Sequence, residues 1–448
     1  MTYDVVVLGA GNAGQAVAGA VKKAGRSVAI IESREVGGVC PNRGCVPKKV
    51  LVAAATALDH IQHASTHGIT TGAPTLDWPA LIARKEGFVG PLPGAMTQSL
   101  EGRGIDVLRG EAKFAGPRSV EVDGKIVEAE QIIVATGSRP RPLSFPGAEH
   151  LRTSEDFLRS PARPEKVVFV GAGVIAFEFA HLLARMGSEV TLLEVGARPL
   201  GRLDAELVAE LVAHSEAEGI TIHTGVRIEG IDSGAEGLGV RVRVGEATHR
   251  LTADAVFNGA GRVANVDTIA IERAGITLDR GRPALTPSLQ SKENPAVWFA
   301  GDALATAPQL SPVATYEGRL VGHNLLNPDD LREPDYSSLP SAVFTIPTVA
   351  TVGLTEAQAI AQGLEVEVKE TAMKGWISSR THGERASWAK VLIDRSTGMI
   401  VGAHLLGHGA GEVIHIFSLA MRHGIPASEL RSGLYAYPTF TNDIKYLV

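Results

Sequence analysis

The chain has 448 residues, which is enough for two or three domains that each bury a hydrophobic core. Hydrophobic residues make up 44% and charged residues 21%, and a formal charge of -6 gives no reason to expect nucleic acid or a membrane as a partner. No apolar run is long enough to span a bilayer, and the N-terminus does not read as a signal peptide. Two cysteines are too few for a disulfide framework, so we expect a cytoplasmic protein.

The chain opens with a dinucleotide-binding fingerprint. An apolar strand predicted over residues 4–8 runs into Gly9, Gly11 and Gly14, and an Ala-rich helix and a second strand ending at Glu32 follow. In this pattern the glycines allow a tight turn and a close approach of pyrophosphate to the helix N-terminus. The acid accepts hydrogen bonds from ribose hydroxyls. We therefore predict a Rossmann-like unit here.

Both cysteines lie in the next stretch, GGVCPNRGCVPKK, residues 37–49. A helix-like run from Lys48 to Ile61 places Cys45 near a helix N-terminus, where the dipole and nearby lysines stabilise a thiolate. Cys40 is four intervening residues away, so the pair can close a small disulfide ring that exchanges quickly. Two unrelated core cysteines are the alternative. Two thiolates without a histidine cluster cannot complete a zinc site, so no metal site is predicted.

This stretch resembles the redox-active segment of the class I pyridine nucleotide-disulfide oxidoreductases, the flavoprotein family of glutathione reductase, trypanothione reductase, lipoamide dehydrogenase and mercuric reductase. Val39 stands where threonine is usual. The resemblance implies that Cys40 attacks the substrate and that Cys45 sits against the flavin of FAD. It also implies that Lys48 and Gly38 lie beside the flavin.

Two later stretches resemble the points where the family's chain crosses between its dinucleotide-binding domains. Residues 128–142 read as a strand that ends in an Ala-Thr-Gly motif, and residues 253–266 match the return crossing, with Ala264 where proline is usual. The resemblance implies cofactor-binding residues on and near these crossings: Ala112, Thr136, Gly137, Gly261 and Arg262.

The dinucleotide fingerprint occurs a second time between these crossings. Residues 166–194 repeat the strand, Gly171, Gly173, a helix, a second strand and Glu194. Two fingerprints imply two dinucleotides, one the bound FAD and the other the hydride source. Ile175 is expected at the second dinucleotide. A structural duplication with one inactive site is the alternative, although both copies keep the glycine turn and the terminal acid.

The acid at the end of the second fingerprint bears on the choice of nicotinamide cofactor. A carboxylate at Glu194 pairs with a ribose 2′-hydroxyl and repels a 2′-phosphate, which favours NADH. Arg198 and Arg202 follow closely and leave NADPH possible. Glu178, on the helix between, resembles the family's acid that pairs with the lysine near the flavin, here Lys48.

A second flavin motif follows the return crossing. A strand predicted near residues 296–300 leads into Gly301 and Asp302, and the stretch LSPVATYEGR comes next. A plain Gly-Asp turn is the alternative, but the strand before it and the stretch LSPVATYEGR after it favour the flavin motif. Asp302 would then bind the ribityl chain of FAD.

After about Tyr336 the dinucleotide pattern stops. Residues 341–359 and 389–407 alternate as antiparallel strands do, and residues 411–424 form an amphipathic helix. On that helix, His415 is interpreted as a core or interface residue rather than a catalyst. This unit resembles the family's dimerisation domain, so a homodimer is expected. The predicted fold is α/β, with two Rossmann-like domains and an α+β dimerisation domain, and its boundaries are 1–143 and 265–335 for FAD, 144–264 for NAD(P), and 336–448.

The chain departs from the family at its C-terminus. Disulfide-reducing members carry a His–Glu dyad in a motif HPTxxE, whereas this chain reads YAYPTFTND, with Tyr437 and Asn442 at the dyad positions. A phenol with a pKa near 10 can donate a proton but is a poor base for activating Cys40. Tyr437 is therefore a candidate proton donor, with simple packing at the dimer interface as the alternative. The carboxylate of Asp443 has no histidine to orient.

These observations predict an FAD-dependent oxidoreductase that passes electrons from NADH to a Cys40–Cys45 disulfide and on to a low-molecular-weight disulfide or a related thiol-linked acceptor. The sequence argues against glutathione disulfide as the acceptor, because the helix after Gly14 lacks the arginine with which glutathione reductases bind the carboxylate of their substrate. One alternative is a quinone, dye or metal-ion reductase in which the flavin is the direct donor. A flavin-bearing redox sensor or complex subunit is an alternative of another class.

Overall fold

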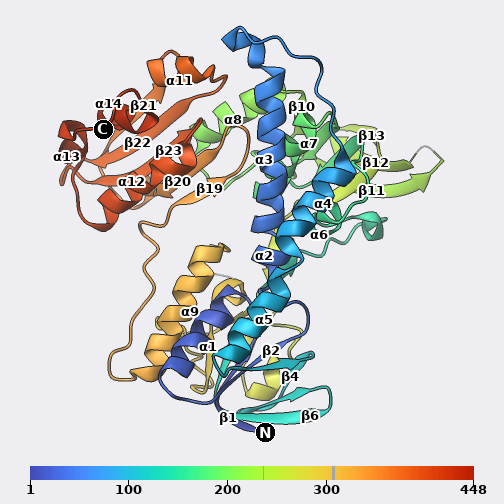
Figure 1. The fold of residues 1–448 in the computed structure, drawn as a ribbon, viewed down its shortest axis with the longest axis vertical. Helices are drawn as coiled ribbons and strands as arrows, with labels where there is room; N and C mark the ends of the chain where they lie inside the picture. Colours follow the sequence, from blue (N-terminus) through green and yellow to red (C-terminus); the bar gives the residue numbers. More distant parts are fainter. Residues whose placement is uncertain (236, 305–307) are drawn as a thin grey trace.

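The computed structural model describes residues 1–235, 237–304 and 308–448, and it is organised around three sheets (Figure 1). The first sheet has the order β3-β2-β1-β6-β5-β4, and β18 pairs with β6. Its central strands are parallel and contain continuous buried apolar runs, such as Val5–Leu8 and Val28–Ile31, as expected of strands buried on both faces. The strands are β1 Thr2–Leu8, β2 Val28–Glu32, β3 Asp106–Arg109, β4 Ala112–Gly116, β5 Ser119–Val122, β6 Lys125–Val134 and β18 Val297–Phe299.

Helices α1 (Asn12–Lys23) and α9 (Ser311–Leu326) pack closely against one another beside this sheet (Figure 1). The close approach needs glycine on α9, because a Cβ at Gly322 would lie 2.8 Å from the Cβ of Ala20. Four helices lie between β2 and β3: α2 Val39–Arg43, α3 Cys45–Gln62, α4 Trp78–Val89 and α5 Leu92–Gly102. Figure 1 shows α3 extending from this unit up to the other two.

The second sheet is parallel, with the order β10-β9-β8-β14, and it lies within the chain between β6 and β18. Its strands are β8 Lys166–Val170, β9 Glu189–Leu193, β10 Ile220–His223 and β14 Ala255–Asn258. Its helices are α6 Ser154–Leu158, α7 Val174–Arg185 and α8 Ala205–Ala217, and an antiparallel extension contains β11 Arg227–Gly234, β12 Gly237–Val244 and β13 Ala247–Ala253.

The two crossings into and out of this unit lie side by side. Strands β7 (Ser138–Pro140) and β15 (Arg262–Ala264) pair antiparallel. The amide of Asn265 donates to the carbonyl of Gly137 at 2.9 Å, and the hydroxyl of Thr136 donates to the carbonyl of Asn265 at 2.6 Å. The chain therefore leaves the first unit and returns to it at one point.

The third sheet is antiparallel and has the order β19-β20-β23-β22-β21. The strands predicted from alternating residues are confirmed, and helix α12 (Ala410–Arg422) packs on the sheet through Val413, Ile414 and Phe417. His415 is exposed on α12, so it is not a core residue of the single chain, and its alternative place at the dimer interface stays a prediction. The elements are β19 Ser341–Val343, β20 Val349–Gly353, α10 Glu356–Ala361, β21 Val366–Ala372, α11 Ile377–His382, β22 Trp388–Asp394, β23 Ile400–Leu406, α12 Ala410–Arg422, α13 Ala427–Ser432 and α14 Ile444–Leu447.

The α/β fold class with two dinucleotide-type sheets and an α+β C-terminal unit is confirmed. None of the helices in the described ranges has the length and apolar character that crossing a membrane requires.

Candidate active site

The two cysteines lie on either side of a helix break. Cys40 is in the short helix α2, Gly44 separates the two helices, and Cys45 is the first residue of the 18-residue helix α3. A Cβ at Gly44 would lie 3.0 Å from the carbonyl oxygen of Val39, so the glycine lets α2 fold back on the start of α3. The predicted helix is confirmed and begins three residues earlier, at Cys45. Both thiols are free in this structure.

The two thiols have opposite acidities. The pKa of Cys45 is lowered to about 6, first because Cys40 donates a hydrogen bond to it, and then through Ser311 and the charge of Lys48. The hydrogen bond to Cys45 and burial raise the pKa of Cys40. The pair therefore holds one proton near neutral pH, on Cys40, and leaves Cys45 as the thiolate.

Ser311 was not identified from the sequence. Its hydroxyl lies 3.8 Å from Cys45 Sγ, and it is the first residue of α9, whose second residue is a proline. The available signal was a serine followed by proline, a pair typical of a helix start, since helix N-termini favour anions. Helix α9 lies 266 residues from Cys45 along the chain, so the contact itself had no local signature.

Lys48 and Glu178 form a buried ion pair. Lys48 Nζ lies 2.6 Å from Glu178 Oε1, and their side chains are 13% and 6% exposed. The same carboxylate oxygen accepts the amide of Phe344 at 3.0 Å, and Lys48 Nζ lies 4.4 Å from the centre of the Phe344 ring. The pairing joins α3, α7 and the segment after β19.

The glycine turns fit dinucleotides. Gly9 has φ +109°, and a Cβ there would overlap the carbonyl oxygen of Ala135; Gly171 has φ +95°, and a Cβ there would lie 2.6 Å from the amide of Ala260. Helices α1 and α7 begin after Gly11 and Gly173, and neither has a side-chain cap among the described residues. The first-turn amides are thus open to phosphate.

The redox segment lies directly against the first glycine turn. Gly38 has φ +69°, and a Cβ there would lie 2.9 Å from the Cα of Gly11. Gly14 is equally constrained, because a Cβ there would lie 3.0 Å from the side chain of Val7. The fold therefore brings the first fingerprint and the cysteine segment together, as a flavin site between them requires.

The two terminal acids make the same contacts in both fingerprints. Glu32 accepts from the amide of Ala10 at 2.8 Å, and Glu194 accepts from the amide of Ala172 at 2.9 Å. The second oxygen of each carboxylate accepts a further amide at 2.8 Å. A carboxylate offers about four acceptor sites, so each acid keeps capacity for ribose hydroxyls.

Asp302 of the second flavin motif is hydrogen-bonded to β7, one of the two crossing segments. Asp302 Oδ2 accepts from Ser138 Oγ at 2.7 Å, and Arg262 donates to Ser138 Oγ at 2.9 Å and to its carbonyl at 2.6 Å. Part of this predicted stretch, residues 305–307, lies outside the described residues. Three other predicted cofactor residues are placed at turns or element starts: Ala112 at the start of β4, Gly261 (φ +93°) before β15 and Ile175 at the start of α7.

Glu317 was also missed from the sequence. It is fully buried on α9, and its carboxylate accepts the amide of Gly301 at 2.7 Å and the hydroxyl of Tyr336 at 2.6 Å. Burial raises its pKa to about 7, with the nearby charge of Asp302 acting in the same direction. An acid inside an otherwise apolar helix face was the available signal.

The C-terminal motif does not form a substitute dyad within one chain. Tyr437 is 66% exposed, and no hydrogen bond joins it to either cysteine among the described residues. Asn442 is buried, and Asp443 accepts a hydrogen bond from Ser378. Asp443 thus has a partner of its own, which the sequence did not indicate. The described ranges contain no group of three residues arranged to hold a metal.

Comparisons with known proteins agree with this geometry. The family model described as pyridine nucleotide-disulphide oxidoreductase matches residues 3–318, and the model of its dimerisation domain matches residues 339–448. Similar proteins include a dihydrolipoyl dehydrogenase of Thermus scotoductus (33% identical, 99% of this chain and 96% of the relative) and a mercuric reductase of Streptomyces lividans (33%, 99% and 95%). A glutathione reductase of Burkholderia cepacia is 30% identical over 98% of this chain and 97% of its own.

Among solved structures, the HOCl-induced flavoprotein disulfide reductase RclA from Escherichia coli is similar, and one of its structures is a Cu(II) complex. That complex has a TM-score of 0.89 and 27% sequence identity, and the match covers 100% of this chain and 99% of the other. The chain belongs to the class I pyridine nucleotide-disulfide oxidoreductases, enzymes that use FAD and NAD(P)H to transfer electrons through a redox disulfide to a disulfide or thiol acceptor.

Proposed function

We propose that this chain is a cytoplasmic, homodimeric NADH-dependent reductase of low-molecular-weight disulfides, with Cys40 and Cys45 as its redox centre. The observation that carries the proposal is the unequal dithiol, in which Cys40 keeps the proton and Cys45 is an anion beside Lys48 and Ser311. A bound flavin would supply this centre with two electrons from the nicotinamide.

The unequal acidities assign the two thiols to different steps. Cys40 attacks a disulfide RS–SR, forms a mixed disulfide and releases one thiolate, which takes up the proton that Cys40 loses. The Cys45 thiolate then attacks the Cys40 sulfur, forms the Cys40–Cys45 disulfide and releases the second thiolate. A low pKa keeps Cys45 ionised for this second attack at neutral pH.

The first attack lacks the histidine base of the relatives. Because the pKa of Cys40 is raised, its deprotonation limits the first step. Cys45 is the nearest base, and it would pass this proton on to the leaving thiolate before it attacks in the second step. In the dimer, Tyr437 would donate a hydrogen bond to the leaving thiolate, since a phenol is protonated at neutral pH. Exchanging Tyr437 for Phe should therefore slow disulfide turnover without slowing reduction by NADH.

The contacts of the second fingerprint favour NADH. Glu194 places a carboxylate at the end of β9, where a 2′-phosphate would be repelled. Arg198 donates to the carbonyls of Leu203 and Gly201 at 3.0 and 3.1 Å, so it is engaged with its own loop. Arg202 is exposed and is the remaining cation for a phosphate.

We assign the two cofactors to the residues that the sequence analysis predicted for them. FAD would be held by the first fingerprint, the redox segment and the second flavin motif, with the Lys48–Glu178 pair beside the flavin. The nicotinamide dinucleotide would lie at the second fingerprint. The residues proposed for FAD are Gly9, Gly11, Gly14, Glu32, Gly38, Ala112, Thr136, Gly137, Arg262, Gly301 and Asp302; those proposed for NADH are Gly171, Gly173, Ile175, Glu194 and Gly261.

The test is anaerobic reduction of the holoenzyme with NADH in wild type, Cys40→Ser and Cys45→Ser. Disulfide chemistry requires a long-wavelength flavin–thiolate absorbance that depends on Cys45. Addition of a small disulfide should remove this absorbance only when Cys40 is present. Full flavin reduction without such absorbance would contradict the proposal.

A second candidate function is a metal-ion or quinone reductase in which the flavin is the direct donor. The observation that favours it is the missing base: Tyr437 replaces histidine, and Asp443 is bound to Ser378. A structure of the similar RclA is a Cu(II) complex, and a mercuric reductase is among the relatives. Acceptor turnover that is unaffected by both cysteine substitutions would select this function.

A further inference from the structure

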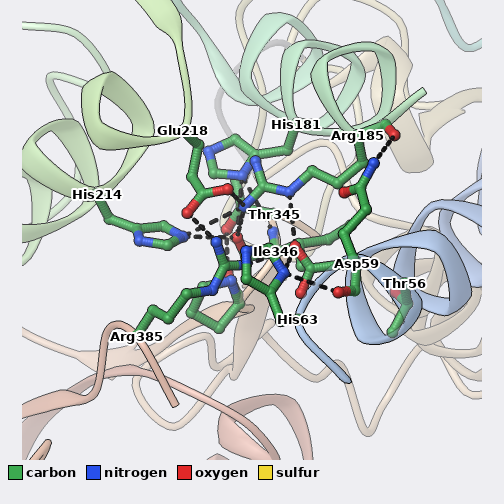
Figure 2. Close-up of polar contacts among 12 residues, drawn as sticks. Thr56, Asp59, His63, His181, Arg185, His214, Glu218, Thr345, Ile346 and Arg385 are labelled. Atoms are coloured by element: carbon green, nitrogen blue, oxygen red, sulfur yellow. Dashed lines mark hydrogen bonds and ion pairs between the residues drawn. The ribbon is translucent and has the colours of Figure 1, made fainter. Parts of the chain in front are cut away.

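A closed ring of charged side chains lies at the far end of α3 and α7 from the cysteines (Figure 2). We call Asp59, Arg185, Glu218 and Arg385 the brace. Arg185 Nε and Arg385 Nη2 lie 3.1 and 2.5 Å from Asp59 Oδ1. Arg185 Nη2 lies 3.3 Å from Glu218 Oε2, and Arg385 pairs with the same carboxylate.

The brace joins all the units of the chain. Asp59 is on α3, Arg185 on α7, Glu218 directly follows α8, and Arg385 precedes β22 of the C-terminal sheet. Two cations and two anions alternate, so every neighbour has the opposite charge. The side chain of Arg185 is 2% exposed, and a charge buried to this extent is stable only with its partners in place.

Helix α7 connects the brace to the redox centre through one stripe of residues. Glu178, His181 and Arg185 recur at helical spacing, and each binds a backbone group of residues 344–346. Glu178 accepts the amide of Phe344 at 3.0 Å, and Arg185 donates to the carbonyl of Ile346 at 2.8 Å. His181 Nδ1 lies 3.2 Å from the amide of Ile346.

The hydrogen bonds of His181 fix its tautomer. Burial lowers its pKa well below the usual value, so the ring is neutral. Ser215 donates its hydroxyl to the carbonyl of Leu211 at 2.7 Å and must therefore accept from His181 Nε2 at 2.8 Å. Nδ1 is then free to accept the amide of Ile346. Glu178, His181 and Arg185 thus bind the backbone of residues 344–346 from three successive positions along α7.

Helix α3 is tied to α7 at both ends. Lys48 near its start pairs with Glu178 near the start of α7, and Asp59 near its end pairs with Arg185 at the end of α7. The helices therefore run in the same direction, and two ties fix their relative slide. Lys48 is one turn after Cys45, so its position sets how strongly its charge acts on that thiol.

We propose that Asp59, Arg185 and Arg385 are positioning residues of the redox centre: the brace holds α3 against α7 so that Lys48 pairs with Glu178 and stabilises the Cys45 thiolate. The inference rests on the proposed roles of Lys48 and Cys45. A brace that only joined the units would affect stability and leave the thiol unchanged.

The test measures the pH dependence of Cys45 alkylation by iodoacetamide in the holoenzyme, in a Cys40→Ser background where Cys45 is the only thiol. The brace variant is D59N/R385Q, which removes one charge of each sign and leaves Arg185 paired with Glu218. R385K is the milder second variant, because lysine keeps the charge but lacks the planar, forked guanidinium that pairs with Asp59 and Glu218 through separate nitrogens. Arg385 is 28% exposed, so the exchange disturbs little packing.

Lys390→Met is the matched control. Lys390 is 1% exposed and pairs with the buried Asp204 at 3.3 Å and with the half-exposed Glu206 at 2.7 Å, so it also joins the C-terminal sheet to the start of α8. Its contacts do not involve α3. Thermal unfolding of each variant shows whether the control and the brace variants lose comparable stability.

Lys48→Met should raise the thiolate pKa of Cys45 by about 1 unit, as the loss of a nearby cation does. D59N/R385Q should raise it by about half a unit, which slows alkylation on the order of threefold below the pKa. R385K should act in the same direction. In the Lys48→Met background the brace variants should have no further effect.

The proposal is overturned if neither brace variant moves the pKa, if Lys390→Met moves it equally, or if the brace effect persists without Lys48. An unchanged pKa in Lys48→Met overturns the role of Lys48 and this inference together. NADH-dependent turnover of a disulfide by the wild type reports separately on the proposed function.

Discussion

Replacing Glu317 by Gln should stabilise the protein at alkaline pH and have little effect at acidic pH. The glutamine keeps an acceptor for the amide of Gly301 and offers its amide group to the hydroxyl of Tyr336. It removes a carboxyl group whose ionisation the buried site opposes. The pKa of Glu317 is raised from 4.5 to about 7, mainly by burial.

The direction of the pH effect follows from proton binding. Between pH 4.5 and 7 the folded state holds a proton on Glu317 that the unfolded state has lost, so stability falls as pH rises through this window. The pKa of Glu317 rises by about 2.5 units on folding, and each unit is worth about 1.36 kcal/mol. Above pH 7 the ionised Glu317 therefore lowers the free energy of unfolding by about 3 kcal/mol. The side chain is fully buried, so solvent does not screen the effect.

The assay is urea unfolding of wild type and Glu317→Gln in parallel at pH 5, 6, 7 and 8. The free energy of unfolding of the variant, relative to wild type, should increase by about 2.5 kcal/mol across this series. Tyr336→Phe is the matched control: its hydroxyl lowers the pKa of Glu317, so its loss should make the wild-type pH dependence steeper. Flavin content should be measured as well, because Gly301 precedes Asp302.

An equal loss of stability at all four pH values in Glu317→Gln would refute this reasoning. It would mean that the carboxylate is ionised throughout, and that its hydrogen bonds outweigh its burial.

Three further outcomes are expected. Ser311→Ala should raise the pKa of Cys45, measured by the pH dependence of alkylation, and an unchanged profile would exclude Ser311 as a thiolate partner. Lys48→Met and Glu178→Gln should each lower the free energy of unfolding by about 3 kcal/mol, because each leaves a buried charge without its partner. The double variant leaves no such charge and should lose clearly less than the sum of the two single losses. Additive losses in urea unfolding would contradict a coupled pair. Glu194→Gln should lower kcat/KM for NADH and reduce the ratio of kcat/KM for NADH to that for NADPH. An unchanged ratio would show that Glu194 does not determine the preference for NADH.

The fold was predictable because its signals are local. Continuous apolar strands, glycine turns and terminal acids specify each dinucleotide unit within about 30 residues, and alternation specifies the antiparallel sheet. The placement of Cys45 at a helix start was predictable for the same reason. For His415 the amphipathic pattern left both a core and an interface position open, and its exposure on the single chain excludes only the core.

The contacts that tune the site were not predictable, because they join distant parts of the chain. Ser311 reaches Cys45 across 266 residues, and Arg385 reaches Asp59 across 326. Residues this far apart in the sequence leave no local pattern from which their contact could be predicted. Asp443 was similar: the sequence shows a carboxylate without its histidine, and only the packing of α11 gives it Ser378 as a partner.

The paired crossings have a consequence for how such a chain could arise and be re-engineered. Gly137 and Asn265 are joined by a hydrogen bond of 2.9 Å, so the second dinucleotide unit begins and ends at almost the same place. A unit with adjacent ends can be inserted into a host, exchanged or removed without stretching the host's chain. A two-strand attachment also resists twisting more than a single linker would. The second unit is thus comparable to an insertable cassette whose paired ends limit its twist, while the ties between α3 and α7 hold it in place.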